Sequence, residues 1–187
     1  MLVAGTENMQ LLFLEPNGMG IKKTVELAAV PVFMLVEGQF DIDCRLYIAC
    51  RDGSIYLYAK NKISEYPLIH IDSKPIGMVK MEKTIIVAAM DNNIHSFYLK
   101  GKKHFTLPMK NEIMALEKLQ TERQGRGAST KPVQTILVAL KNGHVRLYAD
   151  KSLITTIECD DNVLGMCFGI FGREEGCLVL NHKSGAL

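Results

Sequence analysis

Residues 47–58, YIACRDGSIYLY, hold an apolar run, a turn pair and a second run in which apolar and polar residues alternate. The same pattern recurs as VAAMDNNIHSFYL at 87–99 and as LVALKNGHVRLY at 137–148. A less regular copy, LVAGTENMQLLFL, occupies 2–14. Two short runs with β-forming residues around a turn signal are typical of a β-hairpin. The sequence therefore predicts one hairpin repeated four times.

Turn-forming residues separate the two runs in three of these hairpins. The pairs are Asp52-Gly53, Asn92-Asn93 and Asn142-Gly143. Such pairs supply the positive φ that a two-residue hairpin turn requires. We expect these six residues to form structural turns of that type.

The interval between hairpins indicates the architecture. The matching residues Val3, Ile48, Val87, Val138 and Val179 are spaced by 45, 39, 51 and 41 positions. Propeller blades repeat at about 40 to 50 residues. The longest interval contains TERQGRGASTK at 121–131, a polar stretch with little to bury, which predicts a loop inserted over 121–132. Without it the period is regular.

Further apolar runs complete each unit. Candidate innermost strands precede the hairpins at 32–40, 76–81, 112–119 and 163–171, and candidate outermost strands follow them at 66–71, 104–109 and 153–159. Four strands per unit is the composition of a propeller blade. The predicted fold is all-β, a partial β-propeller of four-stranded antiparallel blades, with about three complete blades and two incomplete ones.

The whole chain, 1–187, is interpreted as a piece of a single propeller domain. The expected blades are 1–28 (partial), 31–72, 75–109, 112–159 with its loop insertion, and 162–187 (partial). The chain opens on a second strand and ends just after the turn at 183–185, so we expect both ends to be cut. Alone, such a piece is expected to aggregate or to need a partner. A parallel β-helix has shorter repeats, and a two-sheet sandwich would not repeat hairpins at a constant interval.

Composition and charge exclude several classes of protein. The chain is 48% hydrophobic, and its net charge of +2 is too small to favour a nucleic-acid binder. The five cysteines include no CxxC pair, and an odd number favours a reducing compartment. No run reaches the roughly 18 apolar residues of a membrane span, so membrane contact is expected to be peripheral.

No catalytic, cofactor or metal site is predicted. Cys44, Cys50 and His70 lack the spacing of zinc ligands, and Asp41 with Asp43 lacks the further oxygen ligands of a calcium loop. The glycines at 165–176 match no phosphate-binding motif. Loops far apart in sequence can still converge on a propeller channel, so a propeller enzyme, or another kind of protein-binding propeller, stays the alternative.

Long stretches of the chain resemble a known family. These are PVFMLVEGQFDIDCRLYIACRDGSIYLY at 31–58, the run at 75–109, LVALKNGHVRLYADKSLI at 137–154 and MCFGIFGREEGCLVL at 166–180. They are similar to the middle of the propeller in the Bardet-Biedl syndrome 1 protein family, and LVAGTENMQLLFLEP at 2–16 is similar to the segment upstream. The resemblance covers nearly the whole chain except the stretch around 121–132.

The resemblance implies a non-catalytic scaffold of the BBSome, a coat complex that carries membrane proteins to and from cilia. Family partners are other BBSome subunits, ciliary membrane-protein cargo and a GTP-bound Arf-like small GTPase that docks on the propeller. The implied locations are the cytoplasm, the cilium with its basal body, and the periphery of the ciliary membrane. This sequence lacks the family's earlier and closing blades, so GTPase docking is expected to need the full propeller.

A basic surface is the one candidate site among the loops. The turn Lys100-Gly101-Lys102-Lys103 places three lysines on the face where first-to-second and third-to-fourth strand connections meet. Lysines on a tight turn are hydrated point charges suited to diffuse attraction. We expect Lys100, Lys102 and Lys103 to attract acidic phospholipid without forming a specific pocket.

Overall fold

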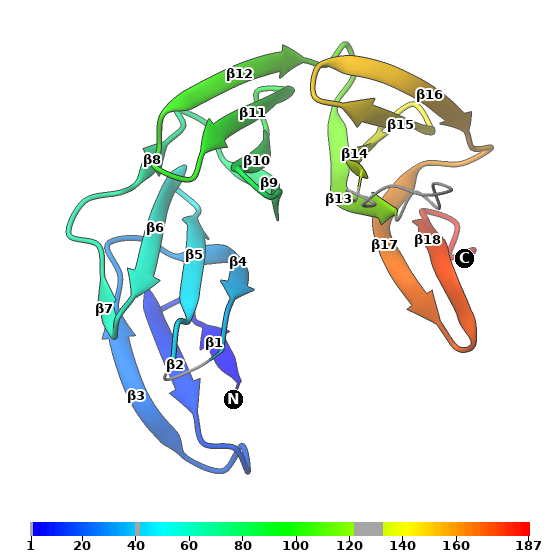
Figure 1. The fold of residues 1–187 in the computed structure, drawn as a ribbon. Coiled ribbons are helices and arrows are strands. Elements are labelled where there is room, and N and C mark those ends of the chain that lie inside the picture. Colours follow the sequence, from blue (N-terminus) through cyan, green and yellow to red (C-terminus); the bar gives the residue numbers. More distant parts are fainter. Residues whose placement is uncertain (1, 40–41, 122–132) are drawn as a thin grey trace, which may run out of the picture.

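The computed structural model describes residues 2–39, 42–121 and 133–187. Its regular elements are all β-strands, and they form five antiparallel sheets arranged in an open arc (Figure 1). Asp41 and most of the loop expected at 121–132 lie outside the described residues. Thr121 is described as the last residue of a strand.

The five sheets are named blades 1 to 5 in chain order. Blade 1 contains β1 (Val3–Gly5), β2 (Gln10–Leu14) and β3 (Ile21–Glu26). Blade 2 contains β4 (Pro31–Glu37), β5 (Arg45–Cys50), β6 (Ser54–Ala59), β7 (Lys62–Ile63) and β8 (Ile69–His70). Blade 3 contains β9 (Pro75–Lys80), β10 (Thr84–Ala89), β11 (Asn93–Tyr98) and β12 (Lys103–Pro108). Blade 4 contains β13 (Ile113–Thr121), β14 (Val133–Leu140), β15 (His144–Ala149) and β16 (Ser152–Glu158). Blade 5 contains β17 (Val163–Phe171) and β18 (Glu174–His182).

Within each blade consecutive strands pair in sequence order, except that β8 of blade 2 pairs with β6. The first strands β4, β9, β13 and β17 face the centre of the arc, and the last strands β12 and β16 lie on its outside (Figure 1). Blade 1 has no strand on the inner side of β1, and blade 5 ends with β18, within the residues that the structure describes. The predicted fold class, a partial propeller of four-stranded antiparallel blades, is confirmed.

The core lies between neighbouring blades. Leu11 of blade 1 packs with Ile48 of blade 2, and Ile55 of blade 2 belongs to a cluster with Val87 of blade 3. Further clusters join blade 3 to blade 4 and blade 4 to blade 5. Each side chain buried in this way contributes about 1.5 to 3 kcal/mol. A blade without a neighbour therefore leaves one apolar face uncovered.

The hairpin loops differ from the expected two-residue turns. In blade 2, Ala49 pairs with Ile55 and the N–H of Gly53 donates to the carbonyl of Cys50 at 3.0 Å, which leaves a three-residue loop. Blades 3 and 4 have the same geometry. Only the third loop residue has a positive φ, namely Gly53, Asn92 and Gly143. A three-residue loop with its last residue in the left-handed region is a common hairpin connection.

The turn pair predicted in blade 3, Asn92-Asn93, lies one residue too far along the chain. Asp91 and Asn92 are equivalent to Asp52 and Gly53, while Asn93 is the first residue of β11. The second loop residue caps the turn in each case: the carboxylate of Asp52 accepts from the N–H of Ser54 at 3.0 Å, and that of Asp91 accepts from the N–H of Asn93 at 3.1 Å. The amide oxygen of Asn142 accepts likewise, at 3.4 Å. An Asx side chain that bonds the backbone two residues on stabilises such turns.

The outer strand of blade 2 is broken, whereas the sequence predicted one run over 66–71. β7 and β8 are two-residue strands that both pair with β6. Pro67 lies between them and has no N–H to donate to a strand partner. The N–H groups of Ser64 and Leu68 instead bond the carbonyls of Leu57 and Ile55.

Candidate functional site

A central cavity of about 710 Å3 lies among the innermost strands of blades 2 to 5. Its wall is apolar along Phe33, Ile76 and Met166. The Nζ of Lys80 on β9 donates to the Oε1 of Glu37 on β4 at 2.9 Å, so an ion pair joins blades 2 and 3 at the cavity. This pair links neighbouring blades, while the Oε2 of Glu37 is buried and has no hydrogen-bond partner.

Glu82, Glu117 and Lys118 also line this cavity. Burial raises the pKa of the Glu117 carboxyl, although the backbone N–H groups of Phe168 and Lys118 donate to it and oppose the shift. Burial lowers the pKa of the Lys118 amine, and the nearby charge of Lys80 lowers it further. Both shifts follow from partial desolvation inside the arc.

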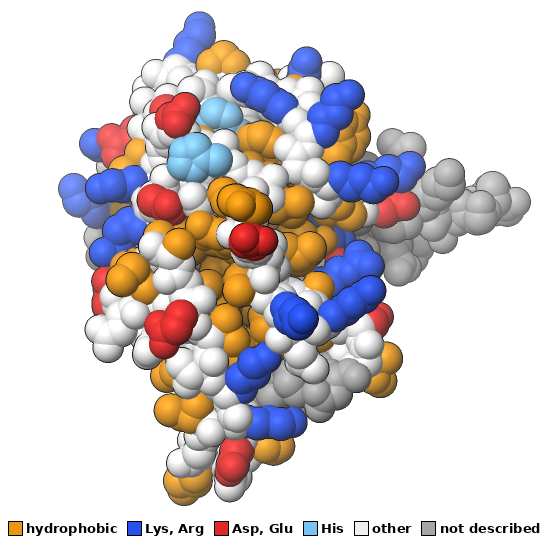
Figure 2. Space-filling model, turned by 90° about the vertical axis from the view of Figure 1, so that its left-hand side faces the viewer, with side chains coloured by type: hydrophobic (Ala, Val, Ile, Leu, Met, Phe, Trp, Pro, Cys, Tyr) orange, Lys and Arg blue, Asp and Glu red, His pale blue; other side chains and the backbone are white. Residues whose placement is uncertain are grey.

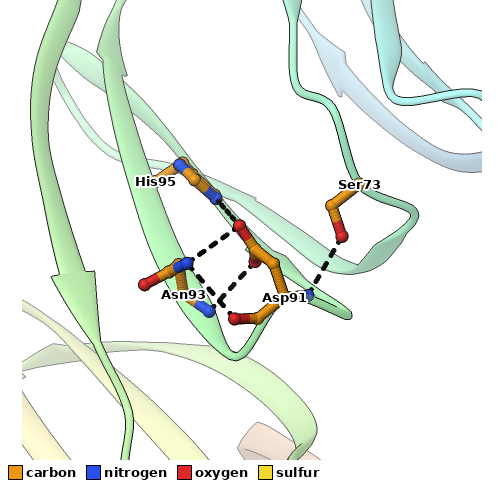
Figure 3. Close-up of polar contacts among 4 residues, drawn as sticks. All are labelled: Ser73, Asp91, Asn93 and His95. Carbon is orange, nitrogen blue, oxygen red and sulfur yellow. Dashed lines mark hydrogen bonds and ion pairs between the residues drawn. The ribbon is translucent and has the colours of Figure 1, made fainter.

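A polar cluster at the hairpin loop of blade 3 contacts the segment that links blade 2 to blade 3 (Figure 3). The Oγ of Ser73 accepts from the N–H of Asp91 at 3.0 Å, and the carboxylate of Asp91 lies 3.0 Å from the Nε2 of His95. His95 is only 9% exposed. Burial raises the pKa of Asp91, but hydrogen bonds from Asn93 and His95 outweigh it, and the pKa lies below its ordinary value. The cluster therefore orders the loop between the blades.

A small cavity of about 200 Å3 opens beside this cluster. It is lined by Asp91, His95 and Phe97 of blade 3, by His70 of β8 and Asp72 just after it, and by Lys103 at the start of β12. Lys103 is thus the one predicted lysine that reaches a cavity. Acidic and basic side chains both line this cavity, so it does not favour a ligand of one charge.

Ser54, His70 and Asp72 form a chain that superficially resembles a hydrolase triad. The Oγ of Ser54 lies 3.2 Å from the Nδ1 of His70, and the Nε2 of His70 lies 3.4 Å from Asp72. Ser54 is 4% exposed, and its hydroxyl donates to the carboxylate of Asp52 at 2.9 Å. A nucleophile must reach substrate and give its proton to the histidine. Ser54 does neither, so the chain serves the turn.

Lys100 and Lys102 lie on the loop between β11 and β12, and Lys103 is the first residue of β12. Lys100, Lys102 and Lys103 are all exposed. The N–H of Gly101 donates to the carbonyl of Tyr98, and the N–H of Tyr98 donates to the carbonyl of Lys102, both at 2.8 Å. A side chain at Gly101 would collide with the carbonyl of Leu68, so this loop packs closely on blade 2. The backbone is fixed while the three amines are free to move in solvent.

The face turned toward the viewer in Figure 2 shows how charge is distributed. Lysine and arginine side chains are spread around an apolar central area with two histidines above it, and they do not gather into one concentrated patch. A dispersed pattern of this kind suits weak, long-range attraction rather than one tight site.

The structure describes Cys44, Cys50, His70 and Asp43 among the residues considered for metals. No group of three His, Cys, Asp or Glu side chains that could hold a metal occurs among the described residues. Cys50 is buried on β5, and burial, aided by the charge of Asp52, raises the pKa of its thiol to about 12. The Oδ1 of Asp43 accepts from the N–H of Gln39 at 2.8 Å and stabilises a turn. In the part of the chain described, no helix is long and apolar enough to span a bilayer.

The sequence analysis missed two contacts: Lys80 with Glu37, which joins blades 2 and 3, and Asp91 with His95, which lies within blade 3. The first pair is 43 residues apart, and nothing in either segment marks it. The second had a signal, because aligning the three hairpin loops by their Asx residues makes Asp91 equivalent to Asp52.

Comparison with known proteins gives consistent matches. Residues 1–59 match the family model described as ciliary BBSome complex subunit 1. Over 186 residues, the chain is 38% identical to the BBSome complex member BBS1 of Mus musculus and 36% identical to that of Homo sapiens. These alignments cover 100% of this chain, and the chain spans 30% of the length of these curated relatives.

Solved structures match over the same extent. Two crystal structures of BBS1N in complex with ARL6DN, one soaked with mercury and one with lead, each give a TM-score of 0.84. Their sequence identities are 31% and 30%, and the matches cover 98% of this chain with 58% and 54% of those chains. The resemblance predicted from the sequence is confirmed.

Proposed function

We propose that this chain, which resembles the N-terminal region of the BBSome subunit BBS1 in both sequence and fold, is a non-catalytic scaffold module of that coat complex. The observation that carries the proposal is the agreement over nearly the entire chain with BBS1N, which was crystallised in complex with ARL6. The module acts in trafficking of membrane proteins to and from cilia. Its partners are other BBSome subunits, ciliary membrane-protein cargo and a GTP-bound Arf-like small GTPase.

The internal geometry supports a scaffold rather than an enzyme. In the central cavity Lys80 and Glu37 form an ion pair and Glu117 accepts backbone hydrogen bonds, and the Ser54–His70 contact belongs to a turn. A rigid set of blades presents loops at fixed positions, so binding residues are distributed over several loops without a sequence motif. The proposed locations are the cytoplasm, the cilium with its basal body and the periphery of the ciliary membrane.

The proposed docking of the Arf-like GTPase requires a complete, closed propeller. Blades 1 and 5 lack strands that blades 3 and 4 possess, within the described residues, and each leaves one face without a neighbour. A docking surface that spans several blades needs their relative positions to be fixed by closure.

Replacing the matching segment of BBS1 by this chain tests the proposed role in the coat complex. In mouse BBS1, the segment that aligns with this chain is replaced by residues 1–187, and the chimera is expressed with the other coat subunits. We expect the chimera to co-purify with the other subunits as the parent does. A chimera that folds but fails to assemble would contradict the proposal.

A further inference from the structure

The outer strand of blade 4 presents an open edge. β16 is the last strand of its sheet, and no described strand pairs with its outer side. It is surface-exposed along its length, and its apolar side chains Leu153, Ile154 and Ile157 are 50%, 53% and 42% exposed. Apolar side chains beside unpaired backbone groups mark a template for pairing with another extended chain.

The register shows which backbone groups face outward. The N–H of Cys159 donates to the carbonyl of Gly143 at 3.0 Å, and Val145 pairs with Ile157 two residues further along. Because hydrogen-bonded and non-hydrogen-bonded pairs alternate in an antiparallel ladder, Thr155 and Ile157 direct their N–H and C=O groups toward β15. Thr156 and Glu158 therefore direct theirs away from the sheet, toward the open edge.

The other outer strands carry features that block such pairing. In β12, Pro108 occupies the position equivalent to Glu158 and has no N–H, and Lys103 begins the strand. β3 carries two lysines, and β7 and β8 are two residues each. Charge, proline and short length are the usual protections of an edge strand. Of β3, β7, β8, β12 and β16, only β16 has a six-residue run, 152–157, without charge or proline.

We propose that β16 is a strand-addition site, at which an extended segment of a partner polypeptide pairs antiparallel with residues 152–158 as a fifth strand. The segment is uncharged and rich in β-branched residues, to match Ile154, Thr156 and Ile157. Basic residues precede it, because its amino end lies beside Glu158 and Asp160. Main-chain hydrogen bonds supply affinity in this mode of recognition, and side chains supply selectivity.

A second copy of the chain fits this edge less well than a partner segment. A stable dimer buries about 1,200 Å2 or more, which a pair of such short strands does not provide. A single peptide strand needs no such area. This inference does not rest on the proposed role in the coat.

The test uses the chimeric mouse BBS1 that carries residues 1–187, because closure of its propeller covers both terminal blades, together with a synthetic probe. The probe is a short peptide of alternating valine and threonine that begins with two lysines. Hydrogen exchange is followed at single amides, at a chimera concentration where sedimentation shows a monomer. We expect the peptide to slow exchange at Thr156 and Glu158 at least tenfold, with little change at Thr155 and Ile157, which already donate to β15.

Matched variants separate edge pairing from loss of structure. Thr156→Pro removes one outward N–H while leaving the hydrogen bonds to β15, and should weaken peptide binding at least tenfold. Thr106→Pro makes the same change at the equivalent position of β12 and should leave binding unchanged. A control peptide that begins with two glutamates should bind more weakly than the lysine peptide.

Three results would overturn the proposal. The first is no protection at Thr156 and Glu158 with saturating peptide. The second is equal binding by Thr156→Pro and the unmodified chimera, when both give the same circular dichroism spectrum. The third is self-association that competes with the peptide and is abolished by Thr156→Pro, which would assign the edge to a second copy.

Discussion

Gly53, in the hairpin loop of blade 2, lies against the backbone of Ile71. The N–H of Ile71 donates to the carbonyl of Gly53 at 3.1 Å, and a β-carbon on Gly53 would overlap the carbonyl oxygen of Ile71. Gly53 also has a φ of +89°. We therefore expect Gly53→Ala to destabilise the chain by at least about 2 kcal/mol, since backbone strain and a clash with main-chain atoms add.

Gly172, in the loop between β17 and β18, is the matched control. It has a φ of +64°, but nothing lies within 4 Å of the position a β-carbon would take. Gly172→Ala should cost only about 1 kcal/mol, the strain of the left-handed backbone. Thermal unfolding monitored by circular dichroism compares the two. Equal losses would contradict the close approach at Gly53.

The acid stability of the chain should depend on Asp91. Its pKa is lowered from the ordinary value of 3.8, so the folded state binds this proton less tightly than the unfolded state does. The resulting stability is present above the unfolded pKa and is lost as pH falls through the lowered folded value. Asp91→Asn keeps the turn contact and should flatten the loss of stability between about pH 5 and 2. Urea midpoints measured across that range check this, and parallel curves would refute it.

Blade architecture was accessible from sequence because strand periodicity and turn residues repeat locally. The sequence pattern of residues 54–59 recurs with the hairpin because each blade packs between neighbouring blades in the same way. The break between β7 and β8 also had a local cause in Pro67, which the apolar run over 66–71 concealed. Three-residue loops were misread because a positive φ was assigned to both residues of each pair.

The contacts between blades could not be predicted from the sequence in this way. The Lys80–Glu37 pair depends on the angle at which blade 3 packs on blade 2, a tertiary quantity that neither strand encodes. The exposure of β16 likewise depends on which strands lie beside it. Whether the exposed turn of Lys100, Lys102 and Lys103 attracts a membrane stays a prediction.

The isolated chain should expose apolar surface at both terminal blades. Leu2 is exposed in blade 1, and Ile170 and Phe171 are exposed in blade 5. Their sheets also have fewer strands than blades 3 and 4 within the described residues. We expect the chain to bind a hydrophobic dye and to aggregate or recruit a partner, and amides of blade 3 should exchange more slowly than those of blade 5. A monomer with a cooperative transition and no dye binding would refute this.

Charge reversal tests the basic turn in the chimeric BBS1 described above. Replacing Lys100, Lys102 and Lys103 by glutamate should weaken binding to anionic liposomes at low salt, since each lysine contributes about 1 kcal/mol near an anionic surface. The difference should disappear at high salt, where the Debye length is short. Replacing Lys74, Lys110 and Lys183, exposed lysines of the opposite face, gives the same charge change and should have less effect. Equal effects would show that net charge, not this turn, matters.

Titration of the GTP-loaded GTPase tests the central claim most directly. ARL6 is titrated into the chimeric BBS1 propeller that carries residues 1–187, and into the isolated chain, with GDP-loaded ARL6 as the control. A scaffold that needs closure predicts GTP-dependent binding to the chimera and at least tenfold weaker binding to the isolated chain. Equal affinities for the two, or no binding by a folded chimera, would contradict the account.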